Sequence, residues 1–419
     1  MLDDARLRDR YQLERDHPPV PPVRFPFISV RAREGADHLA AWDMTNRFHL
    51  KTAASHCLFS TATLCAASTL AAGAALAAGS VRVLCQGNDP AEANTAQALA
   101  QPIQCSRQIA IVDAALDALV ASLNERALVY EERGELDCAL REFDRAIELK
   151  PESSALFNNR GLAYREKGET ERAIEDFNEA IHLDPDNAFA LNNRGNAYFV
   201  SRQLDRAIQN YNQALAAKPD YAEAYNNRGG AYAGQGDLGR ANENYEAAIR
   251  LKPDYPEAHY NRGIAYLRMR AFDKAIAEFD RVIQLKPGLA EAYNDRGAAW
   301  NEEGKHDRAI EDYNQAIRLK PDYAEAFYNR ALAFHDAGAR DRAIDDFGSA
   351  IRRRPDLSAA FNSRGSVYAE EGQLDRAIQD FDEALRLAPN DAGAQRNRAL
   401  AYAQKAQRGQ VASDATTQP

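Results

Sequence analysis

Asparagine and arginine recur in this chain at intervals of 34 residues, and they are its side chains best suited to chemistry. A carboxamide both donates and accepts hydrogen bonds, so a row of carboxamides can pair with the backbone of an extended peptide whatever its side chains are. A guanidinium forms charge-assisted bonds to carboxylates and can set the register between two helices. Both chemistries bind a partner group, and neither breaks a covalent bond.

The same interval separates eight prolines and divides residues 120–391 into eight repeats of 34 residues. Counted from the first residue of each repeat, position 8 is small, 11 and 24 are aromatic, 20 is alanine and 32 is proline. Apolar residues three and four apart in two segments predict a pair of antiparallel helices in every repeat. A fixed period of this kind is typical of stacked repeat proteins. The prolines are Pro151, Pro185, Pro219, Pro253, Pro287, Pro321, Pro355 and Pro389.

The turn between the two helices has its own signal at position 15. Glycine occupies it in six repeats, where it suits a left-handed helix end. Arg202 and Arg270 replace this glycine in the third and fifth repeats, so we expect those turns to be strained or differently shaped. The glycines are Gly134, Gly168, Gly236, Gly304, Gly338 and Gly372.

These columns resemble the tetratricopeptide repeat (TPR) family over residues 120–391. The resemblance implies an all-α, right-handed superhelical α-solenoid of stacked helix pairs, with the first helices lining an inner groove. It also implies a non-catalytic scaffold that binds an extended peptide or protein segment in this groove. Chaperone-tail-binding members use a lysine at position 5 of one repeat and basic residues at positions 2 and 6 of a later one. No complete repeat here has that set, so a carboxylate clamp is disfavoured.

The resemblance implies that positions 2, 5, 6, 12 and 13 face the groove. Every repeat has asparagine at 5 or 6, and we predict that the set is a peptide-binding ladder; capping or solvation of the first helix is the alternative for any one asparagine. Acidic residues at position 2 favour a basic or neutral ligand. Changing Asn159, Asn193 and Asn227 to alanine should then weaken partner capture and leave melting nearly unchanged. The candidate groove residues are Asn159, Asn193, Asn227, Asn261, Asn329, Glu223, Glu257, Glu291 and Glu325.

Position 7 is arginine in all eight repeats, and position 23 is Glu, Asp or Asn. We predict a structural ladder in which the arginine of the first helix bonds the acceptor on the second; ligand binding by the arginines is the alternative. Arg228→Ala should lower stability by on the order of 1 kcal/mol if the ladder is buried. The arginines are Arg126, Arg160, Arg194, Arg228, Arg262, Arg296, Arg330 and Arg364, and Arg398 follows in the same register.

Other motifs give no catalytic, cofactor or metal site. Residues 234–239 read GxGxxG, but they follow a helix and coincide with the turn glycine, whereas a dinucleotide turn follows a strand. HExxH, CxxC, P-loop and GxSxG motifs are absent, and the histidines are scattered; His306 and His335 lie nearest to neighbouring repeat ends. We therefore expect no enzyme activity and no cofactor. A regulatory or adaptor subunit of an enzyme or envelope assembly, with catalysis elsewhere, is the alternative function.

The regions flanking the repeats predict caps and a processed N-terminus. Residues 85–119 read as a linker and capping helix, 392–408 as a C-terminal capping helix with a polar far side, and 409–419 as a disordered tail. Residues 52–78 lack charged side chains and follow Arg47 and Lys51. We predict a signal peptide over 44–84, with Met44 as the start and 1–43 an over-called leader or disordered. A membrane anchor through 52–84 is the alternative.

Charge and cysteine usage bear on partners and compartment. The net charge is −10, and residues 85–419 carry −12, which argues against nucleic acid or anionic lipid as the main partner. The predicted export places the chain in the bacterial periplasm or outside the cell, or at the membrane if the anchor is kept. A Cys85–Cys105 bridge would suit an oxidising compartment, and unpaired thiols are the alternative. Cys138 is expected to be an ordinary semi-buried residue. Partner identity and oligomeric state stay open.

Overall fold

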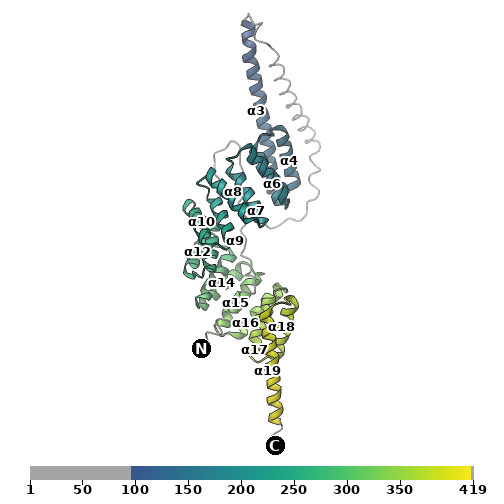
Figure 1. Ribbon diagram of the computed structural model, residues 1–419, viewed down its shortest axis with the longest axis vertical. Helices are drawn as coiled ribbons and strands as arrows, with labels where there is room; N and C mark the ends of the chain where they lie inside the picture. Colours follow the sequence, from purple (N-terminus) through teal and green to yellow (C-terminus); the bar gives the residue numbers. More distant parts are fainter. Residues whose placement is uncertain (1–95, 417–419) are drawn as a thin grey trace. The chain divides into compact units, whose positions relative to one another are not determined.

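The computed structural model describes residues 96–416, with side chains described from 108 to 408. Every regular element in this part of the chain is an α-helix, and the helices follow one another along the repeats (Figure 1). The predicted all-α solenoid of helix pairs is therefore confirmed. The predicted leader over 1–43, the segment 44–84 and the Cys85–Cys105 bridge lie outside the described residues and side chains.

The described chain divides into two compact parts, and the boundary between Ala231 and Tyr232 falls inside α9. We call residues 96–231 the N-terminal array and residues 232–416 the C-terminal array. The N-terminal array contains α3 (Ala96–Glu132), α4 (Leu136–Leu149), α5 (Ser154–Lys167), α6 (Thr170–Leu183), α7 (Ala188–Val200), α8 (Leu204–Ala217) and the start of α9 (Ala222–Gly234). The C-terminal array contains α10 (Leu238–Leu251), α11 (Pro256–Arg268), α12 (Phe272–Leu285), α13 (Ala290–Glu302), α14 (His306–Leu319), α15 (Ala324–Asp336), α16 (Arg340–Arg353), α17 (Ser358–Glu370), α18 (Leu374–Leu387) and α19 (Ala392–Thr416).

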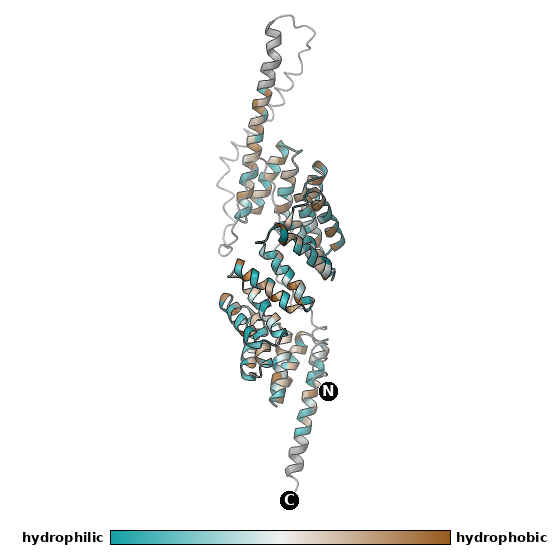
Figure 2. Ribbon diagram, turned by 90° about the vertical axis from the view of Figure 1, so that its left-hand side faces the viewer, coloured by the Kyte–Doolittle hydropathy of each residue, from teal (hydrophilic) through white to brown (hydrophobic). Residues whose placement is uncertain are grey.

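Close contact between the two helices of a repeat explains the small residue at position 8. A Cβ atom on Gly161 would lie 2.7 Å from Phe177 Cε1, and one on Gly195 would lie 2.6 Å from Tyr211 Cε1. Both rings come from position 24 and are fully buried. Figure 2 shows apolar and polar residues mixed along each helix, as expected where one face packs and the other meets solvent.

The turns at Arg202 and Arg270 are strained, as predicted, and do not adopt a different shape. The six turn glycines have φ between 75° and 89°, and Arg202 and Arg270 adopt φ of 61° and 59°. The turn keeps its shape, because Gln203 N donates to Tyr198 O at 2.9 Å just as Glu169 N donates to Tyr164 O at 2.9 Å in a glycine turn. The left-handed conformation costs a residue with a Cβ atom roughly 1–2 kcal/mol, so these two arginines are a local cost of the fold.

The ends of the solenoid differ from the prediction. The expected capping helix at 105–119 and the first helix of repeat 1 form one continuous helix, α3. At the other end α19 continues to Thr416, past the expected end at residue 408, so the predicted disorder is not seen up to Thr416. Gln410, Ala412 and Ala415 favour helix in this segment over an irregular tail. Among the described residues, no helix combines the length and apolar character needed to cross a bilayer.

Candidate functional site

A ladder of side chains joins neighbouring first helices, which contact each other directly. The residue at position 6 of one repeat donates to the residue at position 5 of the repeat before it, 35 positions earlier. In the N-terminal array the Nδ2–Oδ1 pairs are Asn159–Asn124 at 3.0 Å, Asn193–Asn158 at 2.9 Å and Asn227–Asn192 at 3.0 Å. In the C-terminal array they are Asn329–Asn294 and Asn397–Asn362, both at 3.0 Å.

Burial places these carboxamides in the packing between repeats. Asn159, Asn193 and Asn227 are 1%, 0% and 1% exposed. A peptide backbone cannot reach them without displacing a neighbouring helix, so the expectation of an open groove ladder needs correction at these three positions. Asn261 and Asn329 are half-buried. The residue types were predicted correctly, but the prediction did not include that these asparagines bond one another.

The C-terminal array replaces two rungs of this ladder by other chemistry. The Tyr260 hydroxyl donates to Asp295 Oδ2, and the Tyr328 hydroxyl lies 3.4 Å from Ser363 Oγ. Asn294 Nδ2 also donates to Asp295 at 3.0 Å. Burial raises the pKa of Asp295 to about 6, although the hydrogen bonds from Tyr260 and Asn294 act to lower it. One rung therefore carries a carboxyl group that titrates near neutral pH.

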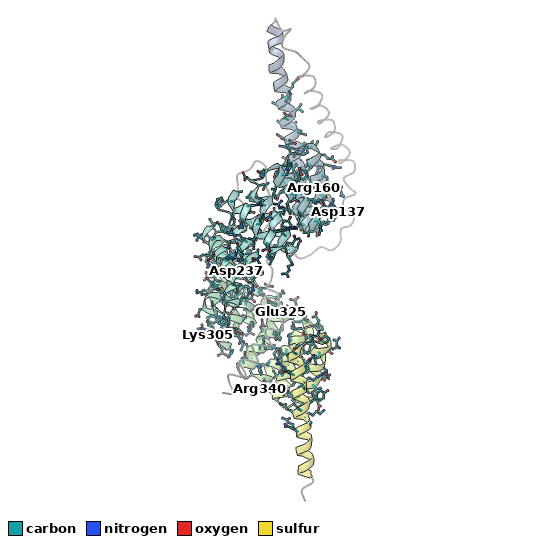
Figure 3. The ribbon with its side chains drawn as sticks, in the orientation of Figure 1. Asp137, Arg160, Asp237, Lys305, Glu325 and Arg340 are labelled. Carbon is teal, nitrogen blue, oxygen red and sulfur yellow. The ribbon has the colours of Figure 1, made fainter. Side chains whose placement is uncertain are left out.

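The predicted arginine ladder is confirmed at position 23 and extends further. Arg160 (labelled in Figure 3) donates to Asp176 at 2.7 and 2.8 Å, and its third bond reaches Asp144 of the preceding repeat at 2.8 Å. Arg296 and Arg330 make the same bonds, to Asp312 and Asp280 and to Asp346 and Asn314. The acceptor at position 25 was missed, although Asp or Asn fills that column in most repeats. Each of these arginines thus joins two repeats.

Neutral partners change the electrostatics of this ladder. Arg194 bonds Asn210 at 2.7 Å and Asn178 at 2.8 Å, so it has two amide acceptors where Arg160 has two carboxylates. Burial lowers the pKa of Arg194. Burial also acts to lower the pKa of Arg160, but the hydrogen bonds to Asp176 and Asp144 hold it above its ordinary value.

The acidic residues predicted at position 2 are paired with basic residues at position 31 of the same repeat. Lys286 donates to Glu257 at 2.5 Å, Lys320 to Glu291 at 3.2 Å, and Arg354 to Glu325 at 2.5 Å. Glu223 is half-buried. The acids at Glu257, Glu291 and Glu325 therefore have partners within the chain, which reduces the acidic bias expected of the groove.

Repeats 2 and 3, in the N-terminal array, lack this acid. Ala155 and Phe189 stand at position 2, and Lys218 at position 31 lies with Nζ 4.9 Å from the centre of the Phe189 ring. An open cavity of about 520 Å³ occupies this place, and Ala155, Asn187, Phe189 and Lys218 contribute to its lining. The site where later repeats have an ion pair is here hollow, with an aromatic ring and an ammonium group at its wall.

Two carboxamides on α7 have hydrogen-bond donors that are not used. Asn192 and Asn196 are both 0% exposed and stand one turn apart. Their oxygens are occupied, since Asn192 Oδ1 accepts from Asn227 and Asn196 Oδ1 accepts from the Tyr211 hydroxyl at 2.7 Å. Neither Nδ2 has a partner among the described residues. An unmade buried donor costs roughly 1–3 kcal/mol, so these two donors are a local cost of packing α7 between its neighbours.

Comparison with known families decides which class of repeat this is. Profiles described as TPR repeat match residues 161–200, 202–236, 231–269, 301–338 and 365–405, and profiles described as tetratricopeptide repeat match residues 142–175 and 256–289. The chain belongs to the tetratricopeptide repeat family. No curated protein sequence matches this TPR chain.

Solved TPR structures share the fold. The APC/C hetero-tetramer Cut9-Hcn1 matches with a TM-score of 0.50 and 15% identity, over 77% of this chain and 66% of that one. A tetratricopeptide repeat protein from Parabacteroides merdae matches with a TM-score of 0.49 and 21% identity, over 59% and 98%. YrrB, a TPR protein with an unusual peptide-binding site, matches with a TM-score of 0.38 and 25% identity, over 44% and 95%. The TPR repeats of the present chain make it a protein-interaction scaffold.

Three histidines of the TPR helices take part in local hydrogen bonds. His306 Nδ1 lies 2.8 Å from Asn301 Oδ1, and His335 Nε2 lies 3.0 Å from Glu370 Oε2. His259 contacts Glu278 at 2.7 Å and Pro253 O at 3.0 Å. Within residues 108–408, no three His, Cys, Asp or Glu side chains gather in a way that could hold a metal ion.

Proposed function

We propose that this TPR chain is a non-catalytic scaffold that holds an extended peptide against α5 and α7 of the N-terminal array. The open cavity of about 520 Å³ beside Phe189 and Lys218 carries this proposal. Every residue of an extended peptide offers a backbone carbonyl, which suits the Lys218 ammonium group, and the Phe189 ring offers apolar contact to a peptide of any sequence.

The surroundings of Phe189 favour a peptide over a small ligand. The cavity beside Phe189 is open to solvent, which suits a chain that enters and leaves. Val200, on the last turn of α7, is 53% exposed and offers apolar contact. Lys218 contacts aromatic rings at this place, so an acceptor group of the ligand can approach its ammonium group.

The test selects peptides from a random library on the full chain and measures their affinity for variants. Lys218→Gln removes the ammonium group at the cavity wall and keeps a long polar side chain. We expect selected peptides to bind this variant at least about tenfold more weakly, the equivalent of one lost charge-assisted hydrogen bond. Lys252→Gln, at the same position of the next repeat, is the matched control and should change affinity less than about twofold. Equal affinity of wild type and Lys218→Gln would contradict the proposal.

We also propose export to an oxidising compartment, with residues 44–84 removed as a signal peptide. Cys138, at the start of α4, is disulfide-bonded, which corrects the expectation of an ordinary thiol there. Disulfides persist in secreted and periplasmic proteins and are rare in the cytosol. N-terminal sequencing of the native protein should give a start near residue 79. An intact Met1 or Met44 would instead support anchoring or retention in the cytosol.

A further inference from the structure

Among the described residues, no second helix covers the C-terminal helix α19, which has the pattern of a first helix. It keeps the TPR pattern, with Ala399 at position 8 and Tyr402 at position 11. In the complete repeat before it, the second helix covers the equivalent face, and a Cβ atom on Gly365 would lie 2.8 Å from Phe381 Cε1. On α19 this face is open, because the helix runs straight on to Thr416.

This face of α19 exposes apolar side chains that would be buried or half-buried in a complete repeat. Tyr402 is 51% exposed and Leu400 is 61% exposed, and Ala399, Ala403 and Ala406 are exposed beside them. The predicted polar far side is therefore wrong at these positions. Repeat arrays end in polar caps because an open apolar face reduces solubility, so a face of this kind favours a covering partner.

The charges of α19 limit what can cover it. Residues 392–408 contain Arg396, Arg398, Lys405 and Arg408 and no acidic residue. Arg398 and Lys405 are paired with Asp382 and Asp375 of α18, so Arg396 and Arg408 leave a charge of about +2 on this helix. A second α19 would bring the same charge, so like-charge repulsion opposes a symmetric contact between two C-terminal helices. The covering surface should be helical, partly apolar and acidic.

The exposed side of α3 has these properties. Residues 108–132 contain five acidic residues and one basic residue, which gives −4. Ile111 is 68% exposed, and Ala115, Ala118 and Glu125 are exposed on the same helix. The apolar residues at 111, 115 and 118 are spaced by four and three, as are positions 20, 24 and 27 of a second helix, which normally cover a first helix.

We propose that the chain self-associates head to tail, with the open face of α19 in one copy covered by α3 of the next. This contact is heterologous, because it joins two different surfaces, and it can continue into longer assemblies or close into a ring. The TPR stack is thereby extended from one copy to the next. The inference is independent of the peptide site on α7.

Two variants that block opposite ends test this proposal by sedimentation velocity on the full chain. Tyr402→Glu places a charge on the α19 face, and Ile111→Glu places one on the α3 face; both positions are exposed, and unchanged helicity by circular dichroism verifies the fold. We expect the wild type to associate with increasing concentration up to about 100 µM, above the monomer mass of 46.4 kDa. Each variant alone should associate at least about tenfold more weakly.

A mixture of the two variants distinguishes the kinds of contact. Ile111→Glu retains an intact α19 face and Tyr402→Glu retains an intact α3 face, so an equimolar mixture should form a one-to-one dimer and nothing larger. Self-association of Ile111→Glu alone would show a symmetric contact between α19 helices and overturn the proposal. Self-association of Tyr402→Glu alone would do so for α3, and a monomeric wild type at all concentrations would overturn it entirely.

Discussion

In the N-terminal array, pairs of asparagines join neighbouring first helices, as in Asn193–Asn158. In the C-terminal array one equivalent rung is Tyr260 with Asp295, and another is Tyr328 with Ser363. Both arrays have the same arrangement of helix pairs, so the two kinds of rung differ only in their side chains. Carboxamide rungs have no ionisable group, whereas the Asp295 rung contains a carboxyl group whose pKa is raised to about 6 by burial.

The two arrays also differ at position 2. Ion pairs such as Glu257–Lys286 fill that place in repeats 5 to 7 of the C-terminal array, whereas repeats 2 and 3 have Ala155 and Phe189 beside a cavity. A TPR repeat can thus use the same position either to hold its own two helices together or to leave space beside the first helix. The peptide site proposed on α7 coincides with the second case.

The largest expected effect comes from removing the carboxamide rungs of the N-terminal array. Asn159→Ala, Asn193→Ala and Asn227→Ala together leave three partners unpaired, of which Asn158 and Asn192 are fully buried and Asn124 is half-buried, at roughly 1–2 kcal/mol each. We expect a loss of about 3–6 kcal/mol in the stability of this array, measured by urea unfolding. The sequence-based expectation of unchanged melting is replaced by this prediction. A triple variant with wild-type stability would contradict a structural role for the rungs.

The arginine ladder should show the next largest effect, and it should depend on its acceptors. Arg296→Ala leaves the carboxylates of Asp312 and Asp280 facing each other without a cation, which should cost about 2–4 kcal/mol. Arg194→Ala leaves only amide acceptors and should cost about 1 kcal/mol. Urea unfolding of both variants measures the difference. Equal losses would mean that packing of the arginine stem, and not charge, sets the stability.

A smaller effect follows from the titration of Asp295. Its folded-state pKa of about 6 lies above that of an unfolded aspartate near 3.9, so the folded state binds the proton more tightly. The contribution of Asp295 to the stability of the folded state is therefore present at acidic pH and is lost as pH rises from about 4 to about 6. Asp295→Asn should stabilise the protein at pH 7 by about 1–2 kcal/mol, because the residue is partly exposed, and should reduce this pH dependence.

The reverse change in the other array is the control for Asp295. Asn193→Asp places a carboxylate in a rung that is otherwise neutral. It should create a loss of stability with rising pH that the wild-type rung lacks, and pH-dependent urea unfolding would detect it. If Asn193→Asp has no such effect, the raised pKa of Asp295 belongs to its particular surroundings and not to the rung position.

The smallest expected effect is at the position-2 ion pairs. Glu257→Gln removes the carboxylate that Lys286 contacts at the edge of α11. Because the Lys286 side chain is 41% exposed, the pair should contribute at most about 1 kcal/mol, and the loss should shrink in high salt. Thermal unfolding at low and high ionic strength measures this. A loss that is large and independent of salt would contradict the exposed character of the pair.

The sequence was sufficient for the fold, because the constraints repeat every 34 residues and each column has a local physical cause. Gly195 is small because Tyr211 packs on it, and Asp176 is acidic because Arg160 faces it; both pairs lie within one repeat, at fixed spacing. Contacts within a repeat can therefore be read from the columns.

Contacts between repeats were harder to predict. The pairing of position 6 with position 5, and of Arg160 with Asp144, depends on how one repeat stacks on the next. The columns contain the right residue types but do not show which partner each one meets. The donors of Asn192 and Asn196 were missed for another reason: an unmade hydrogen bond leaves no pattern in the sequence, although asparagine occurs at position 9 in repeat 3 alone.

The most direct test of the account compares hydrogen exchange of the wild type and Asp295→Asn at about pH 5 and about pH 7.5, corrected for intrinsic rates. Burial also raises the pKa of Asp176, so the variant is needed to isolate Asp295. We expect the amides of α11 and α13 in the wild type to lose about 1 kcal/mol of exchange protection at the higher pH, and those of the variant to lose none. The exchange protection of α5 and α7 should respond to pH in the same way in both proteins. An identical pH response of α11 and α13 in the two proteins would contradict the claim that the rung between first helices controls how the repeats hold together.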